Sequence, residues 1–197
     1  MIIDISSYNG TIDFDTLIRE NDIERVIMRS TLKSGEPDPA LAANISRLEK
    51  INDSIPISFY KFTYARNYVD AVLEATELLY TLKSMLLLKI PETIYLDIEP
   101  VNGRVHTPRE IAEIISGYVS VFERYEIPLG IYCSYSYLKN MPIWSHDLPF
   151  WIARWNDTLG DTSDFNVKMW QYSDKGTVKG INGVVDLSRY VQYEAIH

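Results

Sequence analysis

The sequence predicts an α/β fold, a modified TIM-like barrel with about five βα units followed by three further strands. Strand-like and helix-like segments alternate up to about residue 135, and three strand-like segments without full helices between them follow. Strands separated by helices imply parallel pairing and right-handed crossovers. Eight strands in 197 residues favour one closed or nearly closed barrel, so we expect a single domain over residues 1–197.

An open doubly wound sheet is the alternative architecture. Such a sheet usually carries a Gly-rich first turn that binds a nucleotide. The first turn here, ISSYNGTID, contains no GxGxxG. The barrel is therefore the preferred prediction.

The strands follow from short apolar runs, and the helices from apolar residues at helical spacing. Asp13 is expected to cap the first helix, and Thr107 followed by Pro108 is a strong start for the last. The expected strands cover residues 1–5, 24–30, 55–64, 93–99, 127–134, 148–155, 166–173 and 183–188. The expected helices cover residues 11–21, 38–52, 67–88 and 107–125. The third of these presents one apolar side, formed by Val69, Val72, Leu73, Leu79 and Leu82.

Composition excludes several classes of function. A net charge of −8 with no Lys/Arg cluster argues against a nucleic-acid partner. The longest apolar run, MLLLKI, is too short to span a bilayer, so we expect no membrane insertion. The single cysteine, Cys133, forms no internal disulfide, and the three scattered histidines have no ligand spacing, so we expect neither metal nor cofactor. No signal peptide opens the chain, so export is either handled otherwise or directed by a leader outside it.

The segment TIYLDIEP, residues 93–100, carries two carboxylates on an otherwise apolar strand. Side chains alternate along a strand, so Ile94, Leu96 and Ile98 share one face. Asp97 and Glu99 share the other. In a barrel we expect the isoleucine face under the helices and the two acids inward, at the carboxyl-end mouth where such folds place their chemistry.

Two carboxylates two residues apart on a strand lie about 6.6 Å apart at Cα. Each disfavours ionisation of the other, so one can hold a proton while its neighbour stays charged. Glycoside hydrolysis needs that division of labour. The alternative is a structural pair, satisfied by an arginine or by backbone N–H groups.

Other strand ends carry charged residues too. Asp4 ends the first strand and Asp186 is expected at the end of the last. First and last strands are neighbours in a closed barrel, so these acids are expected to meet at the same mouth, although each is also a plausible turn or cap residue. Arg29 ends the second strand, where it would neutralise Asp4, bind substrate or form a structural ion pair.

The chain resembles the lysozymes of glycoside hydrolase family 25, which cleave the bond between N-acetylmuramic acid and N-acetylglucosamine in peptidoglycan. The matching segments cover nearly the whole chain in family order: DISSYNG, VIMRS, FYKF, YLDIE, GIYCS, WIARW and MWQYSDKGTVKGINGVVDLS. The resemblance implies a barrel of five βα units and three further strands.

The resemblance also implies roles for residues. Glu99 matches the general acid/base and Asp97 the second acid of the same strand. The matches to cleft-lining, substrate-binding positions are Asp4, Asp186, Tyr60, Tyr132, Trp151 and Gln171, with Arg29 as a further candidate and Arg154 and Trp155 as weaker ones. The aromatic residues are alternatively barrel core. Lys61 stands where the family often has His, and Asn9 where it often has Gln.

The implied reaction proceeds with net retention, assisted by the 2-acetamido group of the substrate, with Asp97 as a direct nucleophile in the competing version. A chitinase-like β-N-acetylglucosaminidase is one rival, but Tyr95 and Glu92 replace two Asp residues of its D-x-x-D-x-D-x-E signature. A catalytically inactive domain that only binds wall polymer is the other. We expect a monomer that acts on peptidoglycan at the bacterial cell wall, secreted or phage-encoded, with a wall-binding module outside this chain or an aromatic cleft that supplies the affinity.

Overall fold

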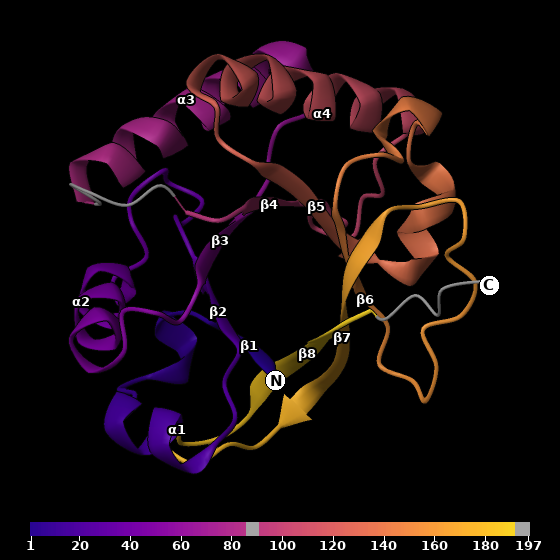
Figure 1. The fold of residues 1–197 in the computed structure, drawn as a ribbon. Helices are drawn as coiled ribbons and strands as arrows, with labels where there is room; N and C mark the ends of the chain where they lie inside the picture. The colour runs from indigo at the N-terminus through magenta and orange to yellow at the C-terminus, as the bar shows by residue number, and fades with distance from the viewer. Residues whose placement is uncertain (86–90, 192–197) are drawn as a thin grey trace.

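The computed structural model describes residues 1–85 and 91–191, and it shows a closed barrel of eight strands (Figure 1). Each strand pairs with its neighbours in the sequence, and the eighth closes on the first. The strands are β1 (Ile2–Ile5), β2 (Arg25–Arg29), β3 (Ile57–Phe62), β4 (Ile94–Asp97), β5 (Leu129–Ser134), β6 (Phe150–Ala153), β7 (Val167–Gly176) and β8 (Val185–Tyr190). The predicted barrel is therefore confirmed, and the open sheet is excluded.

Strand direction separates the last strand from the others. Strands β1 to β7 pair in parallel, whereas β8 runs antiparallel to both β7 and β1. The start of β8 therefore lies at the carboxyl ends of the parallel strands.

Helices cover only part of the barrel. The α-helices are α1 (Phe14–Glu20), α2 (Leu41–Ile51), α3 (Tyr68–Met85) and α4 (Pro108–Phe122). They lie outside β1 to β5, while the outer side of β6, β7 and β8 carries loops and short turns (Figure 1). The short 3-10 turns are η1 (Ser7–Asn9), η2 (Glu123–Tyr125), η3 (Tyr135–Asn140) and η4 (Ile143–Ser145). After β5 the chain forms η3 and η4 instead of an α-helix, so the fifth βα unit is rudimentary.

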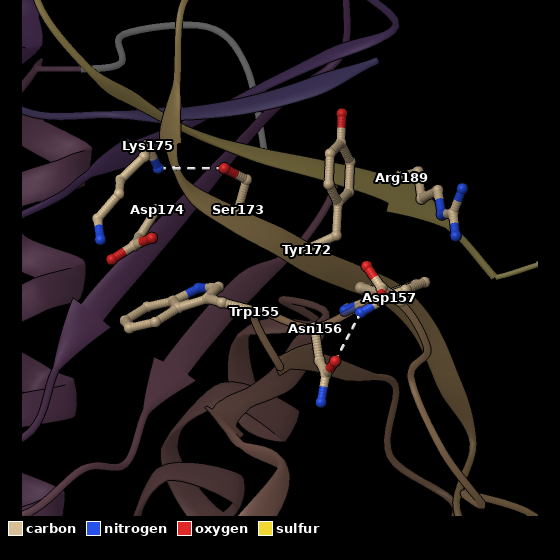
Figure 2. Close-up of a pocket in the computed structure, with 9 residues that line it drawn as sticks. Trp155, Asn156, Asp157, Tyr172, Ser173, Asp174, Lys175 and Arg189 are labelled. Carbon is tan, nitrogen blue, oxygen red and sulfur yellow. Dashed lines mark hydrogen bonds between the residues drawn. The ribbon is translucent and has the colours of Figure 1, made fainter.

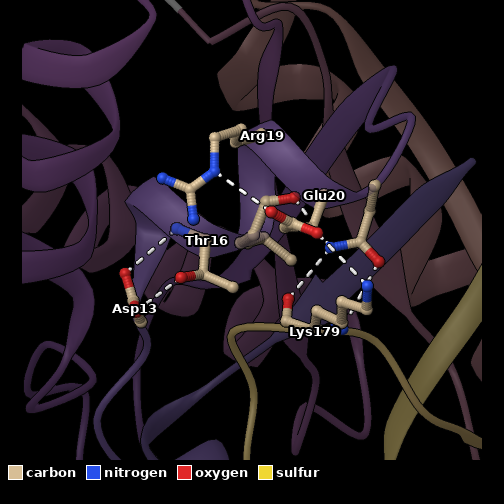
Figure 3. Close-up of polar contacts among 7 residues, drawn as sticks. Asp13, Thr16, Arg19, Glu20 and Lys179 are labelled. Carbon is tan, nitrogen blue, oxygen red and sulfur yellow. Dashed lines mark hydrogen bonds and ion pairs between the residues drawn. The ribbon is translucent and has the colours of Figure 1, made fainter.

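The connection between β7 and β8 is attached to α1 (Figure 3). Asp13 caps α1 as predicted, because its carboxylate accepts the Thr16 backbone N–H at 3.1 Å and the Thr16 hydroxyl at 2.7 Å. At the other end of this helix, the Lys179 ammonium lies 3.2 Å from the Glu20 carboxylate. The Asp13 N–H also donates to the Gly180 carbonyl at 2.9 Å. These contacts hold the hairpin loop beside β1, where the barrel closes.

The predicted apolar side of α3 is partly wrong. Val69 and Leu73 are 63% and 58% exposed, although Val72 and Leu79 pack against the core. The buried residues of α3 are Ala71, Ala75, Leu78 and Leu82. Gly117 of α4 explains the difference, because it lies so close to Ala71 that only small side chains fit between the helices. The predicted helix end near residue 88 lies outside the described residues.

Two separate apolar cores lie on the two sides of the sheet. Ile94, Leu96 and Ile98 are fully buried in the outer core, between sheet and helices. The inner core fills the barrel with Ile2, Ile27, Tyr95, Tyr132, Trp151, Ala153 and Met169, with Tyr60 packed against them. The predicted alternation along β4 is therefore confirmed. Within residues 1–85 and 91–191, no helix has the length and apolarity needed to cross a bilayer.

Candidate active site

Four carboxylates gather at the carboxyl-end mouth of the barrel. Asp97 is the last residue of β4, and Glu99 lies two residues further on. Asp4 of β1 stands directly opposite Asp186 of β8 in the ladder. Mutual charge effects tie the pairs together, since Asp97 is influenced by Glu99 and Asp4, and Glu99 by Asp186.

The position predicted for Asp186 needs a correction. Asp186 is the second residue of β8 and not its end. Its expected meeting with Asp4 nevertheless occurs, because the strand runs in the reverse direction. Glu99 likewise lies just beyond its strand, since pairing with β5 ends where the Ile98 N–H donates to the Tyr132 carbonyl at 2.9 Å.

Asp97 is a buried carboxylate with an unpartnered oxygen. The residue is 5% exposed, and within the described part of the chain its Oδ1 atom has no hydrogen-bond partner. Burial raises the pKa of Asp97 well above its ordinary value, and the charges of Glu99 and Asp4 raise it further. A buried acceptor without a partner is costly, so this atom needs an explanation, and a catalytic role is one.

Asp4 and Asp186 form a pair of acidic groups with raised pKa values. Burial raises the pKa of Asp4 well above its ordinary value, and the charge of Asp186 adds to this, whereas a hydrogen bond from Gln171 opposes it. Burial also raises the pKa of Asp186. The two groups therefore titrate as a pair, and each disfavours ionisation of the other.

Glu99 has the properties of a proton donor. It is half-buried, and burial raises its pKa, with the negative charge of Asp186 as the second cause. A carboxyl group whose pKa is raised can hold a proton near neutral pH, as the general acid of a glycosidase must.

Gln171 links the carboxylates to the barrel interior. Its amide nitrogen donates to Asp4 Oδ2 at 3.0 Å. Its amide oxygen accepts the Tyr132 hydroxyl at 2.9 Å and the Trp155 indole N–H at 3.1 Å. This network fixes the orientation of Asp4.

The predicted cleft-lining aromatics lie in the inner core of the barrel, and Tyr132 stands opposite Asp97 in the strand register. Trp151 is 1% exposed at the centre of the barrel, and its ring centroid lies 4.4 Å from that of Tyr132 and 6.5 Å from that of Tyr60. Tyr132 is also buried, and Tyr60 is half-buried. These rings pack together inside the barrel, and substrate contact by them stays a prediction.

Arg29 forms an ion pair with a residue that the sequence did not single out. Its guanidinium lies 2.6 Å from the carboxylate of Asp38, donates to the Ser7 hydroxyl at 2.9 Å and lies 4.6 Å from the centroid of the Tyr8 ring. Arg29 thus pairs with Asp38 and not with Asp4. Tyr8 is 88% exposed, whereas Asp38 is buried, so the open side of this cluster is mainly the Tyr8 ring.

The two departures from the family pattern have structural roles. Lys61 is buried on the outer face of β3, where its ammonium lies 3.4 Å from the Leu32 carbonyl. Asn9 closes η1, because its Oδ1 accepts the Ser6 N–H at 2.8 Å. Lys61 therefore lies outside the barrel interior.

A hollow of about 490 Å³ lies along the β7–β8 hairpin (Figure 2). Its lining residues are Trp155, Asn156, Asp157, Trp170, Tyr172, Ser173, Asp174, Lys175 and Arg189. Of these, the sequence analysis named only Trp155. The missed signal is alternation: Trp170 and Tyr172 interleave with Met169 and Gln171, which point inward, so the two rings point out from a strand that no helix covers.

Metal binding has no support in the described residues. Within residues 1–85 and 91–191, no group of three or more His, Cys, Asp or Glu side chains is arranged to hold a metal ion. The carboxyl groups at the mouth can transfer protons and stabilise positive charge.

Comparisons with known proteins agree with this geometry. The autolytic lysozyme of Clostridium acetobutylicum is 28% identical over 193 residues, which cover 95% of this chain and 55% of that protein. The modular autolysin LytC of Streptococcus pneumoniae superposes with a TM-score of 0.83 at 28% identity, covering 96% of this chain and 46% of that chain. The catalytic domain of the endolysin ply40 from a Listeria monocytogenes bacteriophage superposes with a TM-score of 0.74 at 25% identity, covering 95% and 90%.

This chain spans about half the length of the autolytic lysozyme and of LytC. The model of the family described as glycosyl hydrolases family 25 matches residues 3–181, which is most of the sequence. Together with the barrel and its four carboxylates, this match shows that the chain belongs to glycosyl hydrolases family 25.

Proposed function

We propose that this chain is a peptidoglycan hydrolase of the lysozyme type, which cleaves the β-1,4 bond between N-acetylmuramic acid and N-acetylglucosamine. The observation that carries the proposal is the pairing of half-buried Glu99, with its raised pKa, and buried Asp97, with its unpartnered oxygen. Membership of a glycosidase family and similarity to proteins named lysozyme and autolysin support it.

The reaction begins with proton transfer from Glu99. The Glu99 carboxyl protonates the departing glycosidic oxygen while the bond to the anomeric carbon breaks. The carbonyl oxygen of the 2-acetamido group attacks that carbon from the opposite side and closes a five-membered ring. Asp97 orients the acetamido N–H and stabilises the positive charge that develops on the ring.

Water completes the cycle. The Glu99 carboxylate takes a proton from a water molecule, whose oxygen attacks the anomeric carbon and opens the ring. Two inversions at the same carbon give net retention. In the competing version Asp97 attacks the anomeric carbon directly, which gives the same stereochemical outcome.

The substrate places the reaction at the bacterial cell wall. Many cell walls are polyanionic, so a domain of net charge −8 gains no long-range attraction to them. We therefore propose that affinity comes from contacts near the mouth or from a wall-binding module in a longer protein. Salt-independent binding of this chain alone to sacculi would favour contacts near the mouth.

Glu99→Gln tests the proposal. We expect a loss of turnover on purified sacculi of about 10²–10⁴-fold, the usual contribution of a general acid. Glu123→Gln is the matched control, because it makes the same change at an exposed side chain of η2 and should leave turnover unchanged.

Product analysis separates the candidate functions. Wild-type digests are reduced with borohydride and weighed by mass spectrometry, and reduced muramic acid at the new ends is the expected result. Reduced glucosamine, or cleavage of chitin, would favour the chitinase-like activity instead. The absence of any product would favour a binding domain, and an inverted product anomer by NMR would contradict the retaining mechanism.

A further inference from the structure

The hollow beside the β7–β8 hairpin shares a wall with the carboxylate cluster. Trp155 lines the hollow and donates its indole N–H to Gln171, which in turn donates to Asp4. On the same side, Asp174 lines the hollow, and its charge acts on Asp186. A ligand bound across the mouth would therefore reach the hollow with a group attached close to the reacting bond.

The floor of the hollow is aromatic and carries a stacked cation. Trp170 is 6% exposed, and the Arg189 guanidinium lies 4.5 Å from its ring centroid and 5.6 Å from that of Tyr172. Stacking positions the guanidinium while leaving its N–H groups free to donate in the ring plane. Arg189 itself is exposed, so those donors face solvent.

The rim carries charges of both signs without partners. Lys175 and Arg189 stand at opposite ends of the hollow, with Asp174 beside Lys175 and Asp157 toward Arg189 (Figure 2). Among the residues that the structure describes, none of these four side chains forms an ion pair. Unpaired charges around an aromatic floor favour a ligand that itself carries both charges.

A neutral sugar does not use such a rim. Pyranose rings need aromatic faces and neutral hydrogen-bonding groups, whereas fixed charges of both signs match the carboxylate and ammonium groups of a short peptide. In peptidoglycan such a peptide is attached to the lactyl group of each muramic acid, next to the bond that is cut. The bound glycan would therefore carry its peptide to one side of the mouth.

On these grounds we propose that the hollow lined by Trp155, Tyr172, Asp174, Lys175 and Arg189 binds the peptide substituent of the glycan strand. Arg189 and Lys175 bind the carboxylates of the peptide, and Asp157 and Asp174 bind its ammonium group. This inference rests on the proposed lysozyme activity and adds a specificity to it: glycan with attached peptides is the preferred substrate.

The first test compares two substrates. Glycan strands with their peptides are assayed beside the same strands after an amidase has removed them. We expect the Arg189→Gln/Lys175→Gln double variant to lose about 10-fold in kcat/KM on the peptide-bearing strands and less than 2-fold on the stripped strands. Lys168→Gln, at an exposed position on the same strand, is the matched control and should resemble wild type on both.

The outcomes are decisive. An equal loss on both substrates, or a loss on neither, overturns the peptide site while leaving the lysozyme activity intact. If wild type cleaves neither substrate, the proposed function fails, and a binding measurement then decides about the hollow.

The second test needs no turnover. The Glu99→Gln protein is titrated with a muramoyl dipeptide, and binding is followed by the NMR signals of the Trp155 and Trp170 indoles. We expect both signals to shift, and the apparent affinity to fall at least 5-fold when Arg189→Gln is added. N-acetylmuramic acid without peptide should leave the Trp170 signal in place. Equal affinity with and without the Arg189 substitution would overturn the proposal.

Discussion

Replacing Asp97 by Asn should stabilise the fold while it abolishes catalysis. The side chain is 5% exposed, one of its oxygens has no partner in the described residues, and Glu99 and Asp4 oppose its ionisation. Asparagine has nearly the same shape and carries no charge, so it removes the repulsion without opening a cavity.

The magnitude follows from the raised pKa. Asparagine keeps a polar atom at the same position and removes only the charge, so each unit by which the folded pKa exceeds the ordinary value contributes about 1.4 kcal/mol. The upper bound is about 4 kcal/mol, because the native protein can always protonate Asp97, and protonating a carboxyl group with an ordinary pKa near 3.9 costs that much at pH 7. For a chain of this size each kcal/mol moves the unfolding midpoint by about 2–4 °C, so we expect a rise of several degrees.

The sign of the pH dependence follows from proton binding. The pKa of Asp97 is raised in the folded protein, so between its unfolded and folded values the native state binds more protons than the unfolded state. Stability therefore falls as pH rises through that window, and the penalty is complete above the folded pKa. Below about pH 4 both states are protonated and the penalty disappears.

Thermal unfolding of wild type and Asp97→Asn, followed by circular dichroism from pH 4 to 8, provides the assay. The variant should exceed wild type by the largest margin at neutral pH and by little at pH 4. Asp22→Asn, the same change at an exposed side chain, should show no such margin. A variant that is no more stable than wild type at pH 7, or a margin that does not shrink in acid, would refute the reasoning.

Two further predictions concern the neighbouring acid and the helical shell. Asp186→Asn should move the alkaline limit of the pH–activity profile to lower pH. The charge of Asp186 helps to raise the pKa of Glu99, and Glu99 must be protonated to act as the acid. An alkaline limit that does not move would contradict this coupling. Gly117→Ala should cost about 1–3 kcal/mol in urea unfolding, because the added Cβ would lie 2.6 Å from the Ala71 Cβ and 2.8 Å from the Tyr68 carbonyl oxygen; an unchanged midpoint would show that the helices separate without cost.

The inner and outer faces of the strands could be predicted because the period of a strand is two. Ile94, Leu96 and Ile98 form an apolar series that lies in the outer core, and because side chains alternate along a strand, Asp97 points inward. The barrel followed from counting such segments. These features depend on local sequence and on elementary packing.

Strand direction and helix rotation could not be predicted in the same way. A parallel and an antiparallel β8 have the same apolar pattern, and in the structure β8 pairs antiparallel with both β1 and β7. The buried face of α3 was predicted wrongly because the helix packs through small residues. Ala71 and Ala75 are buried, with Ala71 against Gly117, whereas the more apolar Val69 is exposed. Both features depend on contacts between distant segments.

The two acids of the candidate site could be predicted from the sequence, but the contacts and the hollow around them could not. Asp97 and Glu99 are recognisable because charges at the end of an apolar strand need a reason. The sequence did not indicate that Asp38 is the partner of Arg29, because Asp38 stands at the start of a predicted helix. In the structure the helix begins at Leu41, and the Asp38 carboxylate pairs with the Arg29 guanidinium. The hollow was not predictable from the inward-facing residues, because Trp170 and Tyr172 lie on the opposite face of β7.

Strand β7 serves two environments at once. Gln171 on its inner side orients Asp4, and Trp170 and Tyr172 on its outer side form the floor beneath Arg189. Inserting one residue ahead of Trp170 would exchange these roles, sending an indole into the barrel and an amide out to solvent. Deletions and insertions in this segment should therefore be far less tolerated than side-chain changes, since a single backbone error would disable acid positioning and ligand contact together.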